Sequence, residues 1–163
     1  MNNETELLFR VLCFEEGHPR RTQHILKVYA LAKLLGEKAK LSAQELQILQ
    51  AAAILHDIAI KYCKEHFDGV CNQALQKQVA PMLVRQFLEL ADYSPEYIPV
   101  VTELVLKHHD YDAPKNKLLQ FLMEADLIVN CYEAFPDEEK LTKIKTIFKS
   151  QAGKELFNLC VNE

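Results

Sequence analysis

The chain has 163 residues, of which 49% are hydrophobic and 26% are charged, and its formal net charge is -4 at pH 7. This length fits one domain with a single buried core, and the apolar content is too high for a disordered chain. Because the sequence contains no dense run of Lys and Arg, it lacks the positive surface that binds the backbone of duplex DNA or RNA, and we expect no such partner.

Signals for helices recur along the whole sequence, which contains only four glycines and no internal repeat. We predict a first helix over 4–16 and a second helix that Pro19 opens and that reaches about residue 40. Ser42 followed by Glu45 forms a capping-box pattern, which predicts the start of a third helix. This third helix should end at about residue 56.

The middle of the chain is predicted to be less regular over 61–71. A helix is expected over 72–91, where Pro81 kinks or divides it. The next helix is predicted to open at Ser94 and Pro95, by the same logic of a cap followed by a proline. It should end near residue 109 and be closed by an Asp-Ala-Pro turn.

A strongly apolar helix is predicted over 117–134, and a carboxy-terminal pair of helices over 136–160 is predicted to be broken near Gly153. Strand-like alternation is absent, so the predicted fold class is all-α. Short connections favour antiparallel neighbours. We therefore expect a compact single-domain bundle of about seven or eight helices over 1–163.

The cysteines are five in number, are scattered, and include no Cys-x-x-Cys pair. Such a set argues against a disulfide framework and is typical of reduced thiols in a cytoplasm. The amino terminus is acidic and polar, and no apolar run approaches the ~20 residues that cross a bilayer. We expect a cytoplasmic protein without a secretion signal or membrane anchor. The sequence does not determine the oligomeric state, and it is compatible with a homo-oligomer.

The most informative positions are ionisable residues on apolar helix faces, since a buried charge is costly unless it is paired or bound to a metal ion. His24 shares a stripe with Val28, Leu31 and Leu35, so its imidazole should point inward. An inward histidine is either a hydrogen-bonded core residue or a metal ligand, and His24 alone does not decide between the two.

His56 and Asp57 stand together at the end of the apolar segment 51–55. Neutral imidazole and carboxylate are ligands that Mn, Fe or Zn accepts, and an irregular helix end lets adjacent side chains converge on one ion. The alternative is a histidine at a helix end beside a capping aspartate.

Asp126 lies inside the most apolar predicted helix, in line with Leu119 and Leu122. A salt bridge, hydrogen bonds to backbone amides or a metal ion can compensate a carboxylate there. His108 ends another inward face, and His109 follows it. These two imidazoles can complete a first metal site, bind a second ion, contact phosphate, or simply form a polar helix terminus.

Taken in order, His24, His56-Asp57 and Asp126 resemble the signature of the HD superfamily of metal-dependent phosphohydrolases. The core of the resemblance lies over about 20–130, and it continues through 148–156. The segments similar to small stand-alone HD proteins are Arg-Arg-Thr-Gln-His-Ile-Leu-Lys-Val-Tyr-Ala at 20–30, Ala-Ala-Ile-Leu-His-Asp-Ile-Ala-Ile at 52–60, Lys-His-His at 107–109 and Glu-Ala-Asp-Leu-Ile-Val-Asn at 124–130.

The resemblance implies a helical domain with one divalent cation, which can be Mn, Fe, Co, Ni, Mg or Zn. Several branches use further histidines for a second ion, and His108 and His109 are the candidates here. The chain departs from the look-alike proteins where Val79-Ala80-Pro81 replaces a Glu-Gly-Pro-like turn. The metal ligands that the resemblance implies are His24, His56, Asp57 and Asp126.

The expected function is hydrolysis of a phosphoester of a nucleotide or another small phosphorylated metabolite by a metal-activated water. Asp57 would orient the water, and His108 or His109 would donate a proton or stabilise charge. The residues expected to bind the substrate phosphate are Arg20, Arg21, Lys27 and Lys61. For the two lysines, the alternative is that they are simply exposed on the flank of a helix.

Two other classes of protein fit the same residues. One is a regulatory module that binds a metal or nucleotide without turnover and reports it to a partner protein. The other is an HD-type iron oxygenase, which would consume oxygen and release no phosphate. The sequence contains no phosphate-binding Gly-x-x-x-x-Gly-Lys loop, dinucleotide fingerprint or Gly-x-Ser-x-Gly elbow, which argues against nucleotide motors, dehydrogenases and serine hydrolases.

Overall fold

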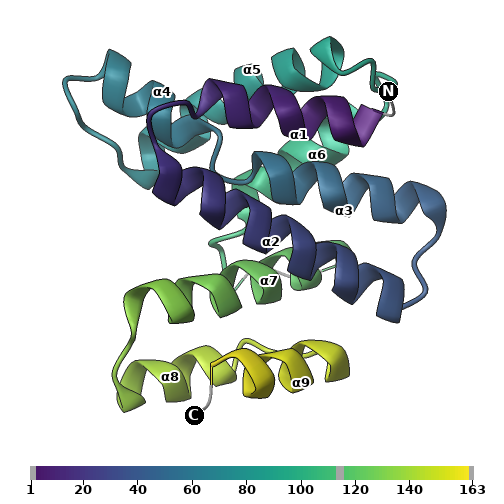
Figure 1. Ribbon diagram of the computed structural model, residues 1–163, viewed down its shortest axis with the longest axis vertical. Coiled ribbons are helices and arrows are strands. Elements are labelled where there is room, and N and C mark those ends of the chain that lie inside the picture. The colour runs from purple at the N-terminus through teal and green to yellow at the C-terminus, as the bar shows by residue number, and fades with distance from the viewer. Residues whose placement is uncertain (1–2, 113–115, 162–163) are drawn as a thin grey trace.

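The computed structural model describes residues 3–112 and 116–161, and every regular element in these ranges is an α-helix (Figure 1). The predicted all-α class is therefore confirmed. None of the helices in the described ranges is long and apolar enough to cross a membrane. The helices are α1 (Asn3–Phe14), α2 (Pro19–Lys38), α3 (Ala43–Leu55), α4 (Ala59–His66), α5 (Gln73–Leu90), α6 (Tyr97–Lys107), α7 (Lys117–Ala134), α8 (Glu138–Lys145) and α9 (Gln151–Cys160).

The signals at two helix starts act as predicted, and a third helix start has a cap that was not predicted. Pro19 is the first residue of α2, and Ser42 and Glu45 form the reciprocal capping box of α3. The side chain of Asn116 caps α7 by accepting a hydrogen bond from the backbone of Leu119 at 2.8 Å. Each contact satisfies a backbone donor that the first turn of a helix otherwise leaves free.

The stretch predicted to be irregular over 61–71 instead contains most of α4. Ala59 and Cys63, one helical turn apart, are both buried in the core. The residue before the helix, Ile58, makes no side-chain cap. Because α4 lacks a start signal and is only 8 residues long, tertiary packing of its apolar side stabilises it, which the local sequence does not reveal.

Three other predicted boundaries need correction. Pro81 does not divide α5, whose buried residues lie on both sides of it. The helix predicted from Ser94 begins at Tyr97, after a short turn. The carboxy-terminal pair is broken over 146–150, and Gly153 lies inside the first turn of α9. Of the turn expected at 112–114, positions 113 and 114 lie outside the described residues.

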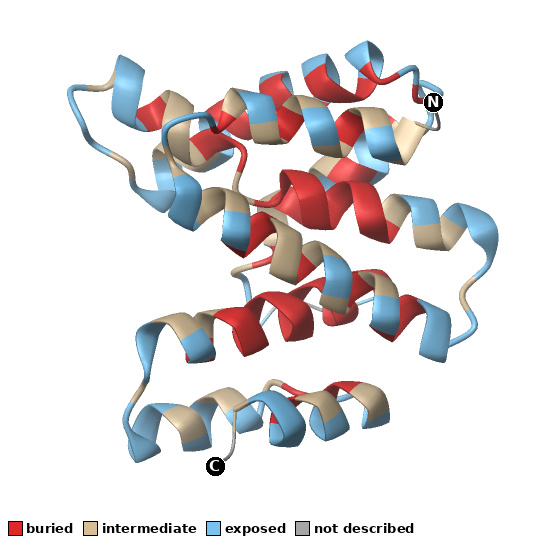
Figure 2. Cartoon of the chain, in the orientation of Figure 1, coloured by how far each residue is buried: buried red, intermediate tan, exposed pale blue. Residues whose placement is uncertain are grey.

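The helices are stacked in layers, with α7 between the body of the bundle and the last two helices. In Figure 1, α1 and α4–α6 lie above α2 and α3, and α8 and α9 lie below α7. Helix α2 packs against both α3 and α7. Figure 2 shows burial concentrated in α7 and in the second half of α3, and 13 residues of α7 are buried. These two helices carry their ionisable residues into the centre of the molecule.

Candidate metal centre

Four helices bring imidazoles and carboxylates to one place. His24 projects from the second turn of α2, and Asp126 from the middle of α7. His56 is the residue at which α3 ends, and Asp57 follows it in the three-residue turn before α4. His108 has the same position at the end of α6. In one continuous helix, adjacent side chains point in different directions. The breaks after α3 and α6 allow such side chains to face the same point, as expected for His56 and Asp57.

The predicted ligand atoms lie within contact distance of one another. The Nε2 atoms of His24 and His56 are 3.1 Å apart. The Oδ1 atom of Asp126 lies 3.3 Å from His24 Nε2 and 3.6 Å from His56 Nε2. The Oδ2 atom of Asp57 lies 3.7 Å from His24 Nε2 and 3.4 Å from His56 Nε2. Residues separated by up to 102 positions (126 minus 24) thus form one cluster, with Asp126 1% exposed.

Asp57 belongs to two sets of side chains that are each compact enough to hold an ion. In the first set its partners are His24 and His56, and in the second they are His108 and His109. The ligand atoms of each set lie within 4.8 Å of one another. Asp57 Oδ1 lies 3.7 Å from His108 Nε2, whereas its Oδ2 faces the first set. The two oxygens of one carboxylate therefore face two candidate positions for an ion.

Hydrogen bonds fix the orientation of three imidazoles. His56 Nδ1 donates to the carbonyl of Ala53 at 2.8 Å, and His108 Nδ1 donates to the carbonyl of Val105 at 2.7 Å. A carbonyl only accepts, so these Nδ1 atoms carry the proton and direct the Nε2 atoms into the cluster. His24 Nδ1 lies 3.0 Å from Glu133 Oε2, which favours the same tautomer. Such second contacts are typical of histidines that bind a metal through Nε2.

Two buried atoms of the cluster make no hydrogen bond within the described residues, namely His108 Nε2 and Asp126 Oδ2. The nearest group to Asp126 Oδ2 is His109 Nε2, at 3.5 Å, which is too long for a strong hydrogen bond. Buried polar atoms normally have partners. Together with a donor set of imidazoles and carboxylates, these unpaired atoms fit a divalent cation.

The electrostatics of the cluster favour charged forms despite burial. Burial lowers the pKa of His56, but the charges of Asp57 and Asp126 outweigh it and raise the pKa to about 9. Burial also raises the pKa of both carboxyls. The charge of His56 beside Asp57, and the imidazole of His109 beside Asp126, hold the pKa of each carboxyl below its ordinary value. Asp57 and Asp126 thus keep their negative charge at the centre of the bundle. Without a metal ion, the proton on His56 compensates part of that charge.

A cleft of about 180 Å³ opens onto the cluster and is lined by residues of α2 and α7 and by the end of the α1 segment. Arg20 and Arg21, two of the predicted phosphate-binding residues, line it. The Nε atom of Arg21 lies 2.7 Å from Oε2 of Glu15, which is 1% exposed. The Nη2 atom of Arg21 is buried and has no hydrogen-bond partner within the described residues, so this guanidinium retains a donor.

The two predicted lysines differ in position. Lys27 reaches the outer part of the site, where its Nζ atom lies 3.0 Å from Oε1 of Glu133. Lys61 donates instead to the carbonyl of Phe14 and lies 5.1 Å over its ring. Lys61 is not among the residues that line the cleft. Contact with the end of α1 therefore accounts for Lys61 without a role in substrate binding.

Three residues of the site were not found by reasoning on the sequence. Glu133 links His24 to Lys27, Asn130 donates to Asp126 Oδ1 at 2.9 Å, and Glu15 holds Arg21. The spacing of Asn130 and Glu133 from Asp126, four and seven residues, places all three on one face of α7. This spacing in the sequence could have identified Asn130 and Glu133 as neighbours of Asp126. No feature of the sequence indicated that Glu15 belongs to the site.

On the other side of the cluster, a small hollow of about 20 Å³ lies beside His56, His108 and His109. Its outer wall comes from α5, including Gln73, Gln76 and Lys77. The segment 79–81, which replaces a turn in the look-alike proteins, is part of α5. Val79 thus stands in a helix where the look-alike proteins have the glutamate of a turn, and the wall of the hollow carries amides and one lysine.

Comparison with known protein families agrees with this geometry. The model of the HD domain matches residues 21–131, more than half of the chain, and the match contains all six histidine and aspartate residues of the cluster. The chain belongs to the HD-domain family, as the resemblance of its motifs indicated. HD domains are commonly hydrolases and typically bind divalent metal ions. The comparisons with curated proteins and with solved structures give no match.

Proposed function

We propose that the chain is a metal-dependent phosphohydrolase that cleaves a phosphoester of a nucleotide or another small phosphorylated metabolite. The observation that carries the proposal is the convergence of Nε2 atoms from α2 and α3 on two carboxylates, while the Nδ1 atoms are held by acceptors. The residues proposed to hold the cation are His24, His56, Asp57 and Asp126. The position between Asp57, His108 and His109 is proposed for a second ion.

A divalent ion held by these residues would lower the pKa of a bound water and would polarise a phosphoryl oxygen. The protein contributes the positions of the reacting groups. Arg20 and Arg21 both line the cleft and supply positive charge for a phosphate there, and the buried carboxylate of Glu15 fixes the guanidinium of Arg21. Bound in this way, the phosphorus is held close to Asp57, which also lines the cleft.

The proton transfers are assigned to the groups with free atoms facing the cluster. Asp57 accepts a hydrogen bond from the attacking water and orients it toward phosphorus. As the phosphorus–oxygen ester bond breaks, the leaving oxygen takes a proton, which His109 would donate in the form with one bound ion, because it is the more accessible of the two histidines. The side chain of His109 is 31% exposed, whereas that of His108 is 5% exposed. His108 is better placed to hold a second ion.

The test begins with elemental analysis of the purified protein, followed by a screen of nucleotides and phosphomonoesters with Mn, Fe, Co, Ni, Mg or Zn. We expect His56→Ala and Asp57→Ala to lose bound metal and phosphate release while most of the helicity by circular dichroism remains, because a buried ligand is lost without a change in helix-forming sequence elsewhere. His66→Ala is the matched control, since His66 is exposed on α4 and contacts only Tyr62 in the described structure.

Full metal content and turnover in either ligand variant would show that the ligand assignment is wrong. Tight binding of a nucleotide without product would favour the regulatory module. Oxygen consumption without phosphate release would favour an iron oxygenase.

A further inference from the structure

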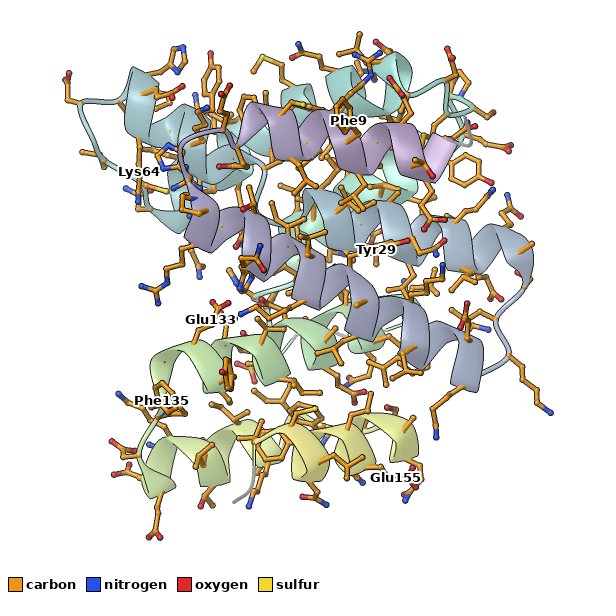
Figure 3. All side chains as sticks on the ribbon, viewed as in Figure 1. Phe9, Tyr29, Lys64, Glu133, Phe135 and Glu155 are labelled. Atoms are coloured by element: carbon orange, nitrogen blue, oxygen red, sulfur yellow. The ribbon has the colours of Figure 1, made fainter. Side chains whose placement is uncertain are left out.

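Two aromatic rings are exposed at the carboxy-terminal end of α7, next to the candidate metal centre. Tyr132 is 59% exposed and Phe135 is 80% exposed. Their ring centroids are 6.1 Å apart, with an interplanar angle of 46°. Figure 3 shows Phe135 at the corner where α7 leads into α8, and Glu133 on the side of α7 that faces α2. The rings contribute little buried area, so core packing does not explain their presence.

The backbone holds Phe135 in a defined place. Its φ of 47° and ψ of 62° are left-handed, and its N–H donates to the carbonyl of Cys131 at 3.0 Å. Glycine is the residue that most easily adopts this conformation at a helix end. A phenylalanine here carries a conformational cost that its exposed ring does not offset by burial, and Pro136 restricts the chain directly after it. The backbone that carries the ring is thus held in place, and the ring itself is not covered.

The groove beside these rings shares two lining residues with the cleft of the metal centre. It has a volume of about 380 Å³ and is lined by residues of α2 and by the end of α7. Arg20 and Glu133 line both the groove and the cleft, and the cleft reaches His24 and Asp57. One molecule can therefore occupy the cleft with a charged group and extend past Arg20 into the groove.

The charges in the groove are arranged for an aromatic group linked to an anion. Lys27 Nζ lies 5.4 Å from the centroid of the Tyr132 ring and 3.0 Å from Glu133 Oε1. Glu133 thus neutralises Lys27 and holds it beside the ring, whereas Arg20 has no ion pair within the described residues and remains available to a phosphate. A planar heterocycle stacks on exposed rings whatever its hydrogen-bonding edge.

We propose that Tyr132 and Phe135 form a stacking platform for the base of a nucleotide whose phosphate lies at the metal centre, with Arg20 between the two parts. The inference rests on the proposed phosphohydrolase function, and it narrows the substrate class from phosphorylated metabolites in general to nucleotides.

The experiment compares a purine nucleoside 5′-monophosphate with ribose 5-phosphate, which has the same phosphate and sugar but no base. The metal-loaded wild type is compared with Tyr132→Leu/Phe135→Leu, and Phe9→Leu is the matched control. Phe9 is 63% exposed on α1, and it lines neither the cleft nor the groove. The readout is the ratio of kcat/KM for the nucleotide to kcat/KM for ribose 5-phosphate.

We expect the ratio to fall by roughly 5- to 150-fold in the double variant, the range that corresponds to the loss of base stacking, and to stay at the wild-type value in Phe9→Leu. The fall should come mainly from a higher KM for the nucleotide. An unchanged ratio, with both substrates still hydrolysed, would overturn the platform and leave the phosphohydrolase proposal intact.

If neither compound is hydrolysed, the phosphohydrolase proposal is decided by the wider substrate screen, and calorimetric binding of the nucleotide to the metal-loaded protein tests the platform by itself. Binding that is at least fivefold weaker in the double variant supports the platform. Absence of binding to the wild type, or equal binding by both proteins, overturns it. An unchanged ratio or equal binding together with a loss of dimers in size-exclusion chromatography would assign the rings to contact between two copies of the chain.

Discussion

The side chains around the metal centre matter as much as the ligands themselves. His24 Nε2 faces the cluster because its Nδ1 atom is held by Glu133, which Lys27 holds in turn. Burial raises the pKa of Glu133, but its contacts with Lys27 and His24 outweigh burial and lower that pKa. A charged carboxylate on the outer nitrogen fixes the tautomer of an imidazole and makes its other nitrogen a stronger ligand. Glu133 is therefore a positioning residue.

Replacing Glu133 with glutamine should weaken metal binding by roughly 10- to 100-fold, the effect typical of the loss of such an outer contact. The amide keeps the size of the side chain but removes its charge. The measurement is a competition titration of metal against a chelator, with tyrosine fluorescence to confirm folding. Glu139→Gln is the control, because Glu139 is exposed on α8 and pairs only with Lys143 in the described structure. Equal metal affinities for Glu133→Gln and the wild type would contradict this role.

At the scale of elements, a buried carboxylate joins α7 to the last two helices. Glu124 is fully buried and accepts hydrogen bonds from the backbone of Lys149 at 2.8 Å and of Ser150 at 2.9 Å. The Ser150 hydroxyl also donates to Glu124 and accepts from the backbone N–H of Gly153 at 2.9 Å. This junction sets the break between α8 and α9 at 146–150, whereas the sequence suggested a break at the glycine.

Gly153→Ala should destabilise the fold by about 1–3 kcal/mol, the usual cost of forcing an extra methyl group into a packed site. A Cβ atom at this position would lie 2.0 Å from Glu124 Oε2, and Glu124 is held by several hydrogen bonds, so it has little freedom to move away. The free energy of unfolding is measured in urea at equilibrium.

Lys154→Ala is the control for this variant, since Lys154 is exposed in the same turn of α9 and its replacement should change the stability by less than about 0.5 kcal/mol. A Gly153→Ala protein as stable as the wild type would mean that the α8–α9 connection adjusts without cost.

At the scale of the whole molecule, the cluster connects helices that lie far apart along the chain. α2 and α7 each supply a proposed ligand, and the turn after α3 supplies His56 and Asp57. An ion that binds all of these groups requires the folded arrangement, and it therefore stabilises the native state relative to the unfolded chain.

Metal should stabilise the folded chain and raise its unfolding temperature. When free metal is 100-fold above its Kd, the free energy of unfolding should increase by about 2.7 kcal/mol. For a chain of this size that corresponds to a rise of about 5–10 °C in Tm. Thermal unfolding is followed by circular dichroism with metal and with chelator. His56→Ala should show no rise, and an equal rise in His56→Ala would indicate that metal binds elsewhere.

The size of this rise should depend on pH in a definite direction. In the metal-free chain, the pKa of His56 is raised from 6.5 to about 9. The stabilisation from this proton is complete below pH 6.5 and is lost as the pH rises through 9. A bound ion replaces the proton and prevents that loss, so the difference in Tm between the two forms should increase from pH 6.5 to 9. A constant difference would contradict protonation of His56 in the metal-free cluster.

Much of this molecule follows from local patterns in the sequence. The cap at Ser42 and the spacing of apolar residues depend on contacts within one or two helical turns, so they are visible in the sequence itself. The same periodicity placed His24 and Asp126 on inward faces, where their charge required compensation. The helix α4 escaped prediction because only its packing against the core stabilises it.

The sequence by itself determined an all-helical chain with histidines and aspartates on the buried faces of its helices. Only the tertiary structure decided which of these groups meet, and which polar partners surround them. Glu133 reaches His24, and Glu15 reaches Arg21, because of the angles and offsets at which helices cross. Lys27 and Lys61 each follow a proposed ligand by about one helical turn in the sequence. Lys27 lies beside the site, whereas Lys61 donates to the carbonyl of Phe14. Crossing geometry depends on the side chains of both helices together, which no spacing within one helix encodes.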